Sequence, residues 1–290
     1  IVSLGIRQTF GLFFFDFNAD LNISISHFGF VIGLQLLMWG VFSPIFGFIT
    51  DRYGGATAIF IGFIFYLAGL FLFYLGLNTG YLFTLTIGLL IGIGLGGTAI
   101  SIPVSVVAKH FPSSNRTIAT GIVTCAGSFG FFVSPLLVRY SLIEIGWEIT
   151  ILYFCFLLGI GLITALFIST PKTAVGNNNN DNQTAKEALI EAFNNKSFIF
   201  LTLGFFVCGW HIALVATHIP TYMMDRGMPD WTAAMILALV GVFNMLGTMG
   251  SGYLATKFSK KKVLSAIYLL RGVSLISVSY THLTLPTMDH

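Results

Sequence analysis

Two ionisable side chains stand inside long apolar runs of this 290-residue sequence. Arg7 comes nine residues before Asp16, and His211 comes nine residues before Pro220. An arginine inside a membrane helix costs about 2.5–3.5 kcal/mol on insertion scales, so it normally faces a cavity or a partner. A guanidinium offers a carboxylate two parallel N–H donors, and an imidazole titrates near neutral pH. The two residues therefore indicate recognition of an organic anion, with His211 as a hydrogen-bonding group or a proton carrier.

Three further polar residues in apolar runs are weaker candidates for the same site. His218 comes two helical turns after His211, about 10 Å along the same helix face. Gln35 and Asn244 are amides, and buried amides often join helices through hydrogen bonds. For each candidate the simpler alternative stays open: an arginine that reaches the headgroups, or a packing histidine or amide. The full set expected to contact a substrate is Arg7, His211, His218, Asn244 and Gln35.

The composition places the chain in a lipid bilayer. Hydrophobic residues make up 56% of the sequence, charged residues make up 9%, and the mean hydropathy is +0.88. Soluble domains carry about a quarter of their residues as charged types. Soluble enzymes, disordered segments and nucleic-acid binders are therefore excluded. The 3 cysteines have no metal-ligand or disulfide spacing, and no membrane-enzyme motif is recognisable, so we expect no metal, no cofactor and no enzymatic activity.

Nine apolar segments are long enough to be membrane helices, since about 20 apolar residues cross a bilayer. Their continuous hydrophobicity favours an all-α bundle over a β-barrel. The first segment is short because the sequence begins inside it, and residues 280–290 resemble a translated cloning linker, so we expect a truncated chain with a non-native tail. The nine expected spans are 1–15, 26–50, 56–77, 81–108, 117–139, 148–170, 198–219, 232–256 and 263–279.

A polar stretch divides these spans into six and three. The expected domains are an N-terminal six-helix half at 1–170, a cytoplasmic linker at 171–197 and an incomplete C-terminal half at 198–279. A short amphipathic helix is expected in the linker around Lys186–Phe193. In span four, Gly88, Gly92 and Gly96 recur at helical spacing and predict a packing seam. Trp147 and Trp231, near span ends, are expected to be interface anchors.

Lysine and arginine in the loops predict the orientation. One side of the membrane receives ten of these residues and the other receives two, so we expect a multi-pass monomer of the bacterial inner membrane with a cytoplasmic N-terminus. The ten are Arg52, Lys109, Arg116, Lys172, Lys186, Lys196, Lys257, Lys260, Lys261 and Lys262; the two are Arg139 and Arg226.

A loop pattern occurs twice. Gly47-Phe-Ile-Thr-Asp51-Arg52-Tyr53-Gly54-Gly55 follows span two, and Gly252-Tyr-Leu-Ala-Thr256-Lys257-Phe258-Ser259-Lys260 follows span eight. The two copies share a glycine, a polar residue, a basic residue and an aromatic residue at equivalent places. Such recurrence indicates a transporter built from parallel repeats. In the first copy, Asp51 can accept a hydrogen bond from a helix N-terminus or an arginine.

These features resemble the major facilitator superfamily, whose loop between spans two and three has this form. Finer similarity points to its monocarboxylate transporter-like and oxalate/formate antiporter-like bacterial branch. The passages concerned are Gly5-Ile-Arg7-Gln-Thr-Phe-Gly11, Lys109-His-Phe-Pro112, Gly121 to Pro135, Cys208-Gly-Trp-His211 and His218-Ile-Pro220.

The resemblance implies a helical bundle in which spans one and seven line a central cavity, with Arg7 facing His211. It implies secondary active transport of a small, monocarboxylate-like organic anion by alternating access, with a proton as the candidate coupling ion in symport or antiport. It also implies that the loop motif controls the conformational cycle. The motif residues are Gly47, Asp51, Arg52, Gly54, Gly252 and Lys257.

Some positions depart from the family pattern. Span four lacks the arginine of proton-coupled drug exporters, span five lacks the Gly-Pro pairing of antiporters, and span eight lacks the Asp and Arg of monocarboxylate carriers. Thr256 stands where the first repeat has Asp51. An exporter of drug-like amphipathic compounds and a non-transporting membrane receptor therefore stay open as alternative functions.

Overall fold

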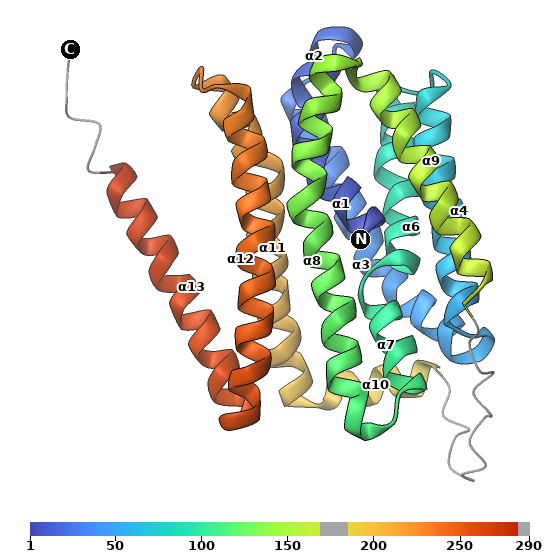
Figure 1. Ribbon diagram of the computed structural model, residues 1–290, viewed down its shortest axis with the longest axis vertical. Helices are drawn as coiled ribbons and strands as arrows, with labels where there is room; N and C mark the ends of the chain where they lie inside the picture. Colours follow the sequence, from blue (N-terminus) through green and yellow to red (C-terminus); the bar gives the residue numbers. More distant parts are fainter. Residues whose placement is uncertain (169–184, 284–290) are drawn as a thin grey trace. The chain divides into compact units, whose positions relative to one another are not determined.

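The computed structural model describes residues 1–168 and 185–283, and every regular element in these ranges is a helix (Figure 1). The expected all-α fold is thus confirmed. Most of the linker expected at 171–197 lies outside the described residues. Of the tail expected at 280–290, residues 284–290 also lie outside them. The short amphipathic helix expected in the linker is present as α10 (Ala185–Asn194).

Helices occupy all nine positions at which spans were expected. Span one consists of three short pieces and span four of four, whereas the other spans are continuous. The bounds are α1 (Val2–Thr9), η1 (Phe10–Phe13) and α2 (Phe14–Leu21); α3 (Ile25–Tyr53); α4 (Gly55–Tyr74); α5 (Gly80–Phe83), η2 (Thr84–Leu90), α6 (Ile91–Thr98) and α7 (Ser101–His110); α8 (Ser113–Glu144); α9 (Gly146–Leu166); α11 (Lys196–Asp225); α12 (Asp230–Lys257); and α13 (Lys260–Leu283).

Within the described residues, seven helical segments are long and apolar enough to cross a membrane. They correspond to spans two through eight of the sequence analysis. The first span is interrupted by the 3-10 segment η1. The ninth, α13, begins with three lysines and runs to Leu283, four residues past the expected end at 279.

Packing divides the chain into two compact units, Ile1–Phe243 and the residues from Asn244 onward. The boundary between these units lies inside α12, and the division into two halves at the linker stays a prediction. The first unit holds α1 to α11 with the beginning of α12, and the second holds the end of α12 with α13.

The glycines of span four let α6 pack between α3 and α4. A Cβ atom on Gly92 would lie 2.7 Å from the Gln35 carbonyl oxygen of α3, and one on Gly94 would lie 2.8 Å from the Gly62 carbonyl oxygen of α4. Gly88 and Gly96 also face α3. Small residues allow such close backbone approach between membrane helices. The packing seam predicted from Gly88, Gly92 and Gly96 is therefore confirmed.

One end of the first unit is closed by an aromatic cluster around Trp147. The Trp147 indole N–H donates a hydrogen bond of 2.7 Å to Asp20 Oδ2, joining the end of α2 to the start of α9. Phe17 and Phe73 pack against its rings. Trp147 is only 8% exposed, so its interpretation as an interface anchor was wrong, because its polar N–H has a partner inside the protein. Trp231 is exposed.

Candidate functional site

Arg7 is a buried cation in the middle of the first unit. Its side chain is 5% exposed, and its guanidinium carbon lies 5.8 Å from the centroid of the Trp39 ring on α3. Tyr66 of α4, which is fully buried, hydrogen-bonds to the same helical turn through the Ser3 carbonyl oxygen. The arginine of span one thus lies against an aromatic residue of span two. The depth of Arg7 in the membrane stays a prediction.

Arg7 has no carboxylate partner among the residues that the structure describes, in which Lys109–Asp51 is the ion pair observed. Its Nε atom is buried without a hydrogen-bond acceptor. A buried charge without a counter-ion is costly, and it persists where a ligand supplies the missing charge. A role of Arg7 in binding an anion stays a prediction, and the free Nε donor is the feature that supports it.

Hydrogen bonds fix the helical turn that carries Arg7. The Tyr66 hydroxyl donates to the Ser3 carbonyl oxygen at 3.1 Å, and the Ser3 hydroxyl donates to the Thr98 carbonyl oxygen at 3.3 Å. These bonds tie α1 to α4 and α6. Both polar side chains are buried, so the bonds replace lost hydration and give the turn a defined position.

Spans one and seven cross at Gly11 of η1. A Cβ atom there would lie 2.6 Å from the Ala216 carbonyl oxygen and 3.2 Å from Pro220 Cγ of α11. Figure 1 shows that the first span and α11 are parallel, since both run the same way from N- to C-terminus. Arg7 comes four residues before Gly11 and His211 five before Ala216, so both lie about 6–8 Å from the crossing at 1.5 Å per residue. That Arg7 and His211 lie at equal depth and face each other stays a prediction.

The two histidines of α11 differ in their surroundings. The His211 ring is half-buried, and its Nδ1 atom is buried without a hydrogen-bond partner among the described residues. His218 is exposed, and its Cε1 atom lies 3.9 Å from where a Cβ of Gly29 on α3 would stand. His211 therefore shares with Arg7 the combination of burial and unused hydrogen-bonding capacity, whereas His218 does not.

The two amides also differ. Gln35 is fully buried, and its Nε2 donates a hydrogen bond of 2.9 Å to the Ile87 carbonyl oxygen of η2. This is the helix-joining role left open by the sequence, although its Oε1 is without a partner among the described groups. Asn244 is exposed and belongs to the second unit. Their contact with a substrate stays a prediction.

Sequence reasoning missed three residues around Arg7. Trp39 and Tyr66 were not singled out because aromatic residues are abundant in every span, and only the fold brings these two to the arginine. Gln8 is 2% exposed, and its Oε1 has no hydrogen-bond partner among the described residues. The criterion that selected Gln35, an amide inside an apolar run, would have selected Gln8 as well.

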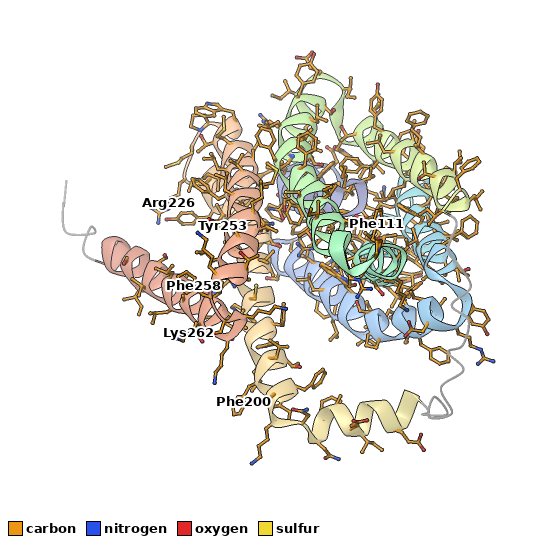
Figure 2. All side chains as sticks on the ribbon, turned by 60° about the horizontal axis from the view of Figure 1, so that its bottom comes forward. Phe111, Phe200, Arg226, Tyr253, Phe258 and Lys262 are labelled. Carbon is orange, nitrogen blue, oxygen red and sulfur yellow. The ribbon has the colours of Figure 1, made fainter. Side chains whose placement is uncertain are left out.

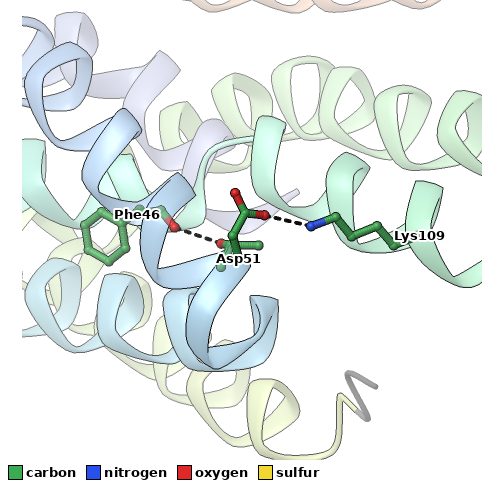
Figure 3. A network of polar contacts seen from close by, with 4 residues as sticks. Phe46, Asp51 and Lys109 are labelled. Carbon is green, nitrogen blue, oxygen red and sulfur yellow. Dashed lines mark hydrogen bonds and ion pairs between the residues drawn. The ribbon is translucent and has the colours of Figure 1, made fainter. Parts of the chain in front are cut away.

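The loop motif after span two forms an ion pair. Lys109 Nζ at the end of α7 lies 2.7 Å from Asp51 Oδ1, beside the Thr50 hydroxyl that donates to the Phe46 carbonyl oxygen (Figure 3). The partner of Asp51 is thus a lysine, and neither a helix N-terminus nor an arginine. The pair is exposed, at 71% for Asp51 and 43% for Lys109, so its contribution to stability is small. Such a pair can break and reform at little cost.

The glycines of the motif have different roles. Gly54 has φ of 93°, a left-handed backbone conformation that favours glycine, and it ends α3. A Cβ atom on Gly47 or Gly252 would meet nothing within 4 Å among the described residues. Close helix packing is therefore not what these two glycines provide in this structure. The basic residues of both copies lie over tyrosines, Arg52 over Tyr53 and Lys257 over Tyr253.

The described residues form a bundle with seven helical segments long and apolar enough to cross a membrane, and within these residues Arg7 is a buried cation without a carboxylate partner. The family model of the Major Facilitator Superfamily matches residues 1–288. The chain belongs to this superfamily.

Three relatives show the range of the similarity. The hexuronate transporter of Bacillus subtilis (strain 168) is 22% identical over 90% of this chain, the Agnestins efflux protein AgnL12 of Paecilomyces divaricatus is 24% identical over 78%, and the nitrite extrusion protein of Bacillus subtilis (strain 168) is 23% identical over 90%. The chain spans 63%, 51% and 64% of their respective lengths. None of these three is named as a member of the monocarboxylate transporter-like or oxalate/formate antiporter-like branch.

A solved structure supports the fold. The D-xylose-proton symporter superposes with a TM-score of 0.63 and 16% sequence identity, covering 89% of this chain and 67% of the symporter. At this identity the match concerns the fold alone. It agrees with the major facilitator-type bundle expected from the loop motif.

Proposed function

We propose that this protein moves a small organic anion with a carboxylate group across the membrane by alternating access. Transport itself follows from the superfamily, whose members compared above are transporters. The substrate class rests on one observation: Arg7 is 5% exposed and has no carboxylate partner among the described residues. An anionic substrate would supply the charge that the site lacks.

The shape of the guanidinium favours a planar anion with two oxygen atoms. Its N–H donors lie in one plane and match a carboxylate through two parallel hydrogen bonds. The hexuronate relative is named for a carboxylate compound, which supports this class. The resemblance of the loop and span-seven passages to the monocarboxylate and oxalate/formate branch favours a small one.

A second candidate substrate is an inorganic oxoanion. Nitrite also presents two oxygen atoms in one plane, and one relative is named for nitrite extrusion. The same arginine would bind either anion. The two candidates differ in size, so the space around Arg7 and His211 would discriminate between them.

The remaining assignments belong to the same proposal. Spans one to six and the spans after the linker would form two halves around the substrate, with the N-terminus in the cytoplasm of a bacterial cell. His211 would contact the anion or carry a coupling proton. The pair Asp51–Lys109 would close and open during the cycle, with Arg52, Gly54 and Lys257 in the same loops.

Flux into proteoliposomes tests the substrate class. Labelled lactate, glucuronate, formate and nitrite would be compared with xylose, which has no charge. We expect uptake of at least one carboxylate, competition by the other carboxylates and no uptake of xylose. Equal uptake of charged and uncharged compounds would refute the anion assignment. Efflux of an amphipathic dye without any anion flux would favour the drug-exporter alternative.

A further inference from the structure

The turn between α12 and α13 concentrates positive charge. Lys257 ends α12, and Lys260, Lys261 and Lys262 begin α13, all with exposed side chains. Residues 244–283 contain no aspartate or glutamate. None of the four lysines has an ion-pair partner in the described part of the chain. Figure 2 shows Phe258 and Lys262 where the two helices meet.

The internal repeat makes this charge unusual, because the equivalent turn between α3 and α4 is partly neutralised. There, Asp51 pairs with Lys109 at 2.7 Å. In the second copy, Thr256 replaces the aspartate and three further lysines follow. Within the described residues, the α3–α4 turn thus has an ion pair, whereas the lysines of the α12–α13 turn have none.

Helix electrostatics adds to the imbalance. A helix N-terminus carries the positive end of the helix dipole, so lysines in the first turn are unfavourable there. The three lysines of α13 occupy that turn. The positive-inside rule accounts for lysines on this side of the membrane. It does not require them to lie in the first turn of a helix, where the helix dipole and the neighbouring lysines repel each charge most. A bound anion would relieve this repulsion.

Exposed aromatic side chains flank the lysines of the turn. Tyr253 and Phe258 are both 59% exposed, and Lys257 Nζ lies 4.7 Å from the centroid of the Tyr253 ring. Exposed tyrosines such as Tyr253 are typical of the membrane–water boundary. Further along α13, Leu264 and Ile267 are exposed and apolar. A ligand at this turn therefore meets cations, then aromatic rings, then an apolar helix face.

We propose that the α12–α13 turn, defined by Tyr253, Lys257, Phe258 and Lys260–Lys262, binds the headgroup of an anionic phospholipid. Its phosphate would lie among the lysines and its acyl chains along Phe258 and the apolar face of α13. A free phosphate would use the lysines but not the apolar surface. In polybasic segments next to a membrane helix, each lysine raises the affinity for anionic lipids about fivefold.

Native mass spectrometry of the purified protein in detergent tests the proposal. Phosphatidylglycerol would be titrated against the parent, against Lys260→Gln/Lys261→Gln, and against the matched control Arg116→Gln/Lys196→Gln, which removes two cations elsewhere. We expect the first variant to lose affinity about tenfold or more and the control to change less than about twofold. Lys260→Arg/Lys261→Arg keeps both charges and should retain the parent's affinity, which separates charge loss from misfolding.

Two comparisons separate the sources of the phosphate. Phosphatidylcholine should bind at least about tenfold more weakly than phosphatidylglycerol, and glycerol 3-phosphate at the same concentration should not displace the lipid. Displacement by glycerol 3-phosphate would identify a free-phosphate site and overturn the lipid assignment. Equal losses in the two glutamine variants would show that the lysines act only as general surface charge, and would also overturn it.

Discussion

The guanidinium carbon of Arg7 lies 5.8 Å from the ring centroid of Trp39, so the buried cation of span one rests against a neutral aromatic ring of span two. A cation–π contact is worth about 2 kcal/mol or more when it is desolvated. Such a partner stabilises the arginine without cancelling its charge. A carboxylate in the same place would compete with any incoming anion, whereas Trp39 leaves the N–H donors available.

Arg7 is expected to be the main determinant of anion affinity. Arg7→Ala should lose about 2–5 kcal/mol of binding, the range seen when one member of a buried charge pair is removed. Arg7→Lys keeps the charge but loses the two-pronged geometry, so it should lose less. Binding of a carboxylate by titration calorimetry measures both. Arg226→Ala, at an exposed arginine lying over Tyr222, is the control. Unchanged affinity in Arg7→Ala would make Arg7 structural.

Trp39 is expected to matter through Arg7. Trp39→Phe keeps an aromatic face and should retain most of the anion affinity, whereas Trp39→Leu fills similar space without attracting the cation. We expect Trp39→Leu to weaken binding by about 0.5–2 kcal/mol, the range of a cation–π contact. In the Arg7→Ala background the two Trp39 variants should bind equally. A difference that persists there would show that Trp39 acts without the arginine.

His211 is expected to share its ligand with Arg7. The combined variant Arg7→Ala/His211→Ala should then lose less affinity than the sum of the single losses, because both side chains would contact one anion. His218→Ala, at an exposed ring on the same helix, should be additive with Arg7→Ala. Additivity within about 0.5 kcal/mol for His211 as well would place the two groups in separate environments.

Asp51 and Lys109 are expected to control turnover and not affinity. Their ion pair is exposed, so Asp51→Asn and Lys109→Gln should each change the free energy of unfolding by less than about 1 kcal/mol. Transport turnover should nevertheless fall in both variants if the pair forms in one state of the cycle. Initial rates and binding constants measured on the same preparations separate the two effects. Weaker anion binding with unchanged turnover would contradict this assignment.

The sequence predicted the helices better than the surroundings of the site. Hydrophobic run length predicted the spans, and glycine spacing predicted a packing seam on span four, because both are local properties of the chain; that α3 is the partner of this seam comes from the fold. The neighbours of Arg7 come from residues 39 and 66, and no local pattern joins them to residue 7. Trp147 was misread for the same reason, since its partner Asp20 stands 127 residues away. Contacts between residues that are far apart in the sequence cannot be predicted from the residue composition of a single span.

Gly92 and Gly47 offer a matched test of the glycine packing. A Cβ on Gly92 would lie 2.7 Å from both the Gln35 carbonyl oxygen and Met38 Cβ, backbone and near-backbone atoms that cannot rotate away. Gly92→Ala should therefore push α6 away from α3 and destabilise the protein by about 1–3 kcal/mol, the usual cost of overpacking.

The control is Gly47→Ala, whose added Cβ atom meets nothing within 4 Å among the described residues. It should be neutral or stabilising by up to about 1 kcal/mol, because alanine favours helix over glycine. Thermal unfolding in one detergent compares the two variants. Equal stability of Gly92→Ala and Gly47→Ala would show that α3 and α6 are not packed as closely as the backbone positions require.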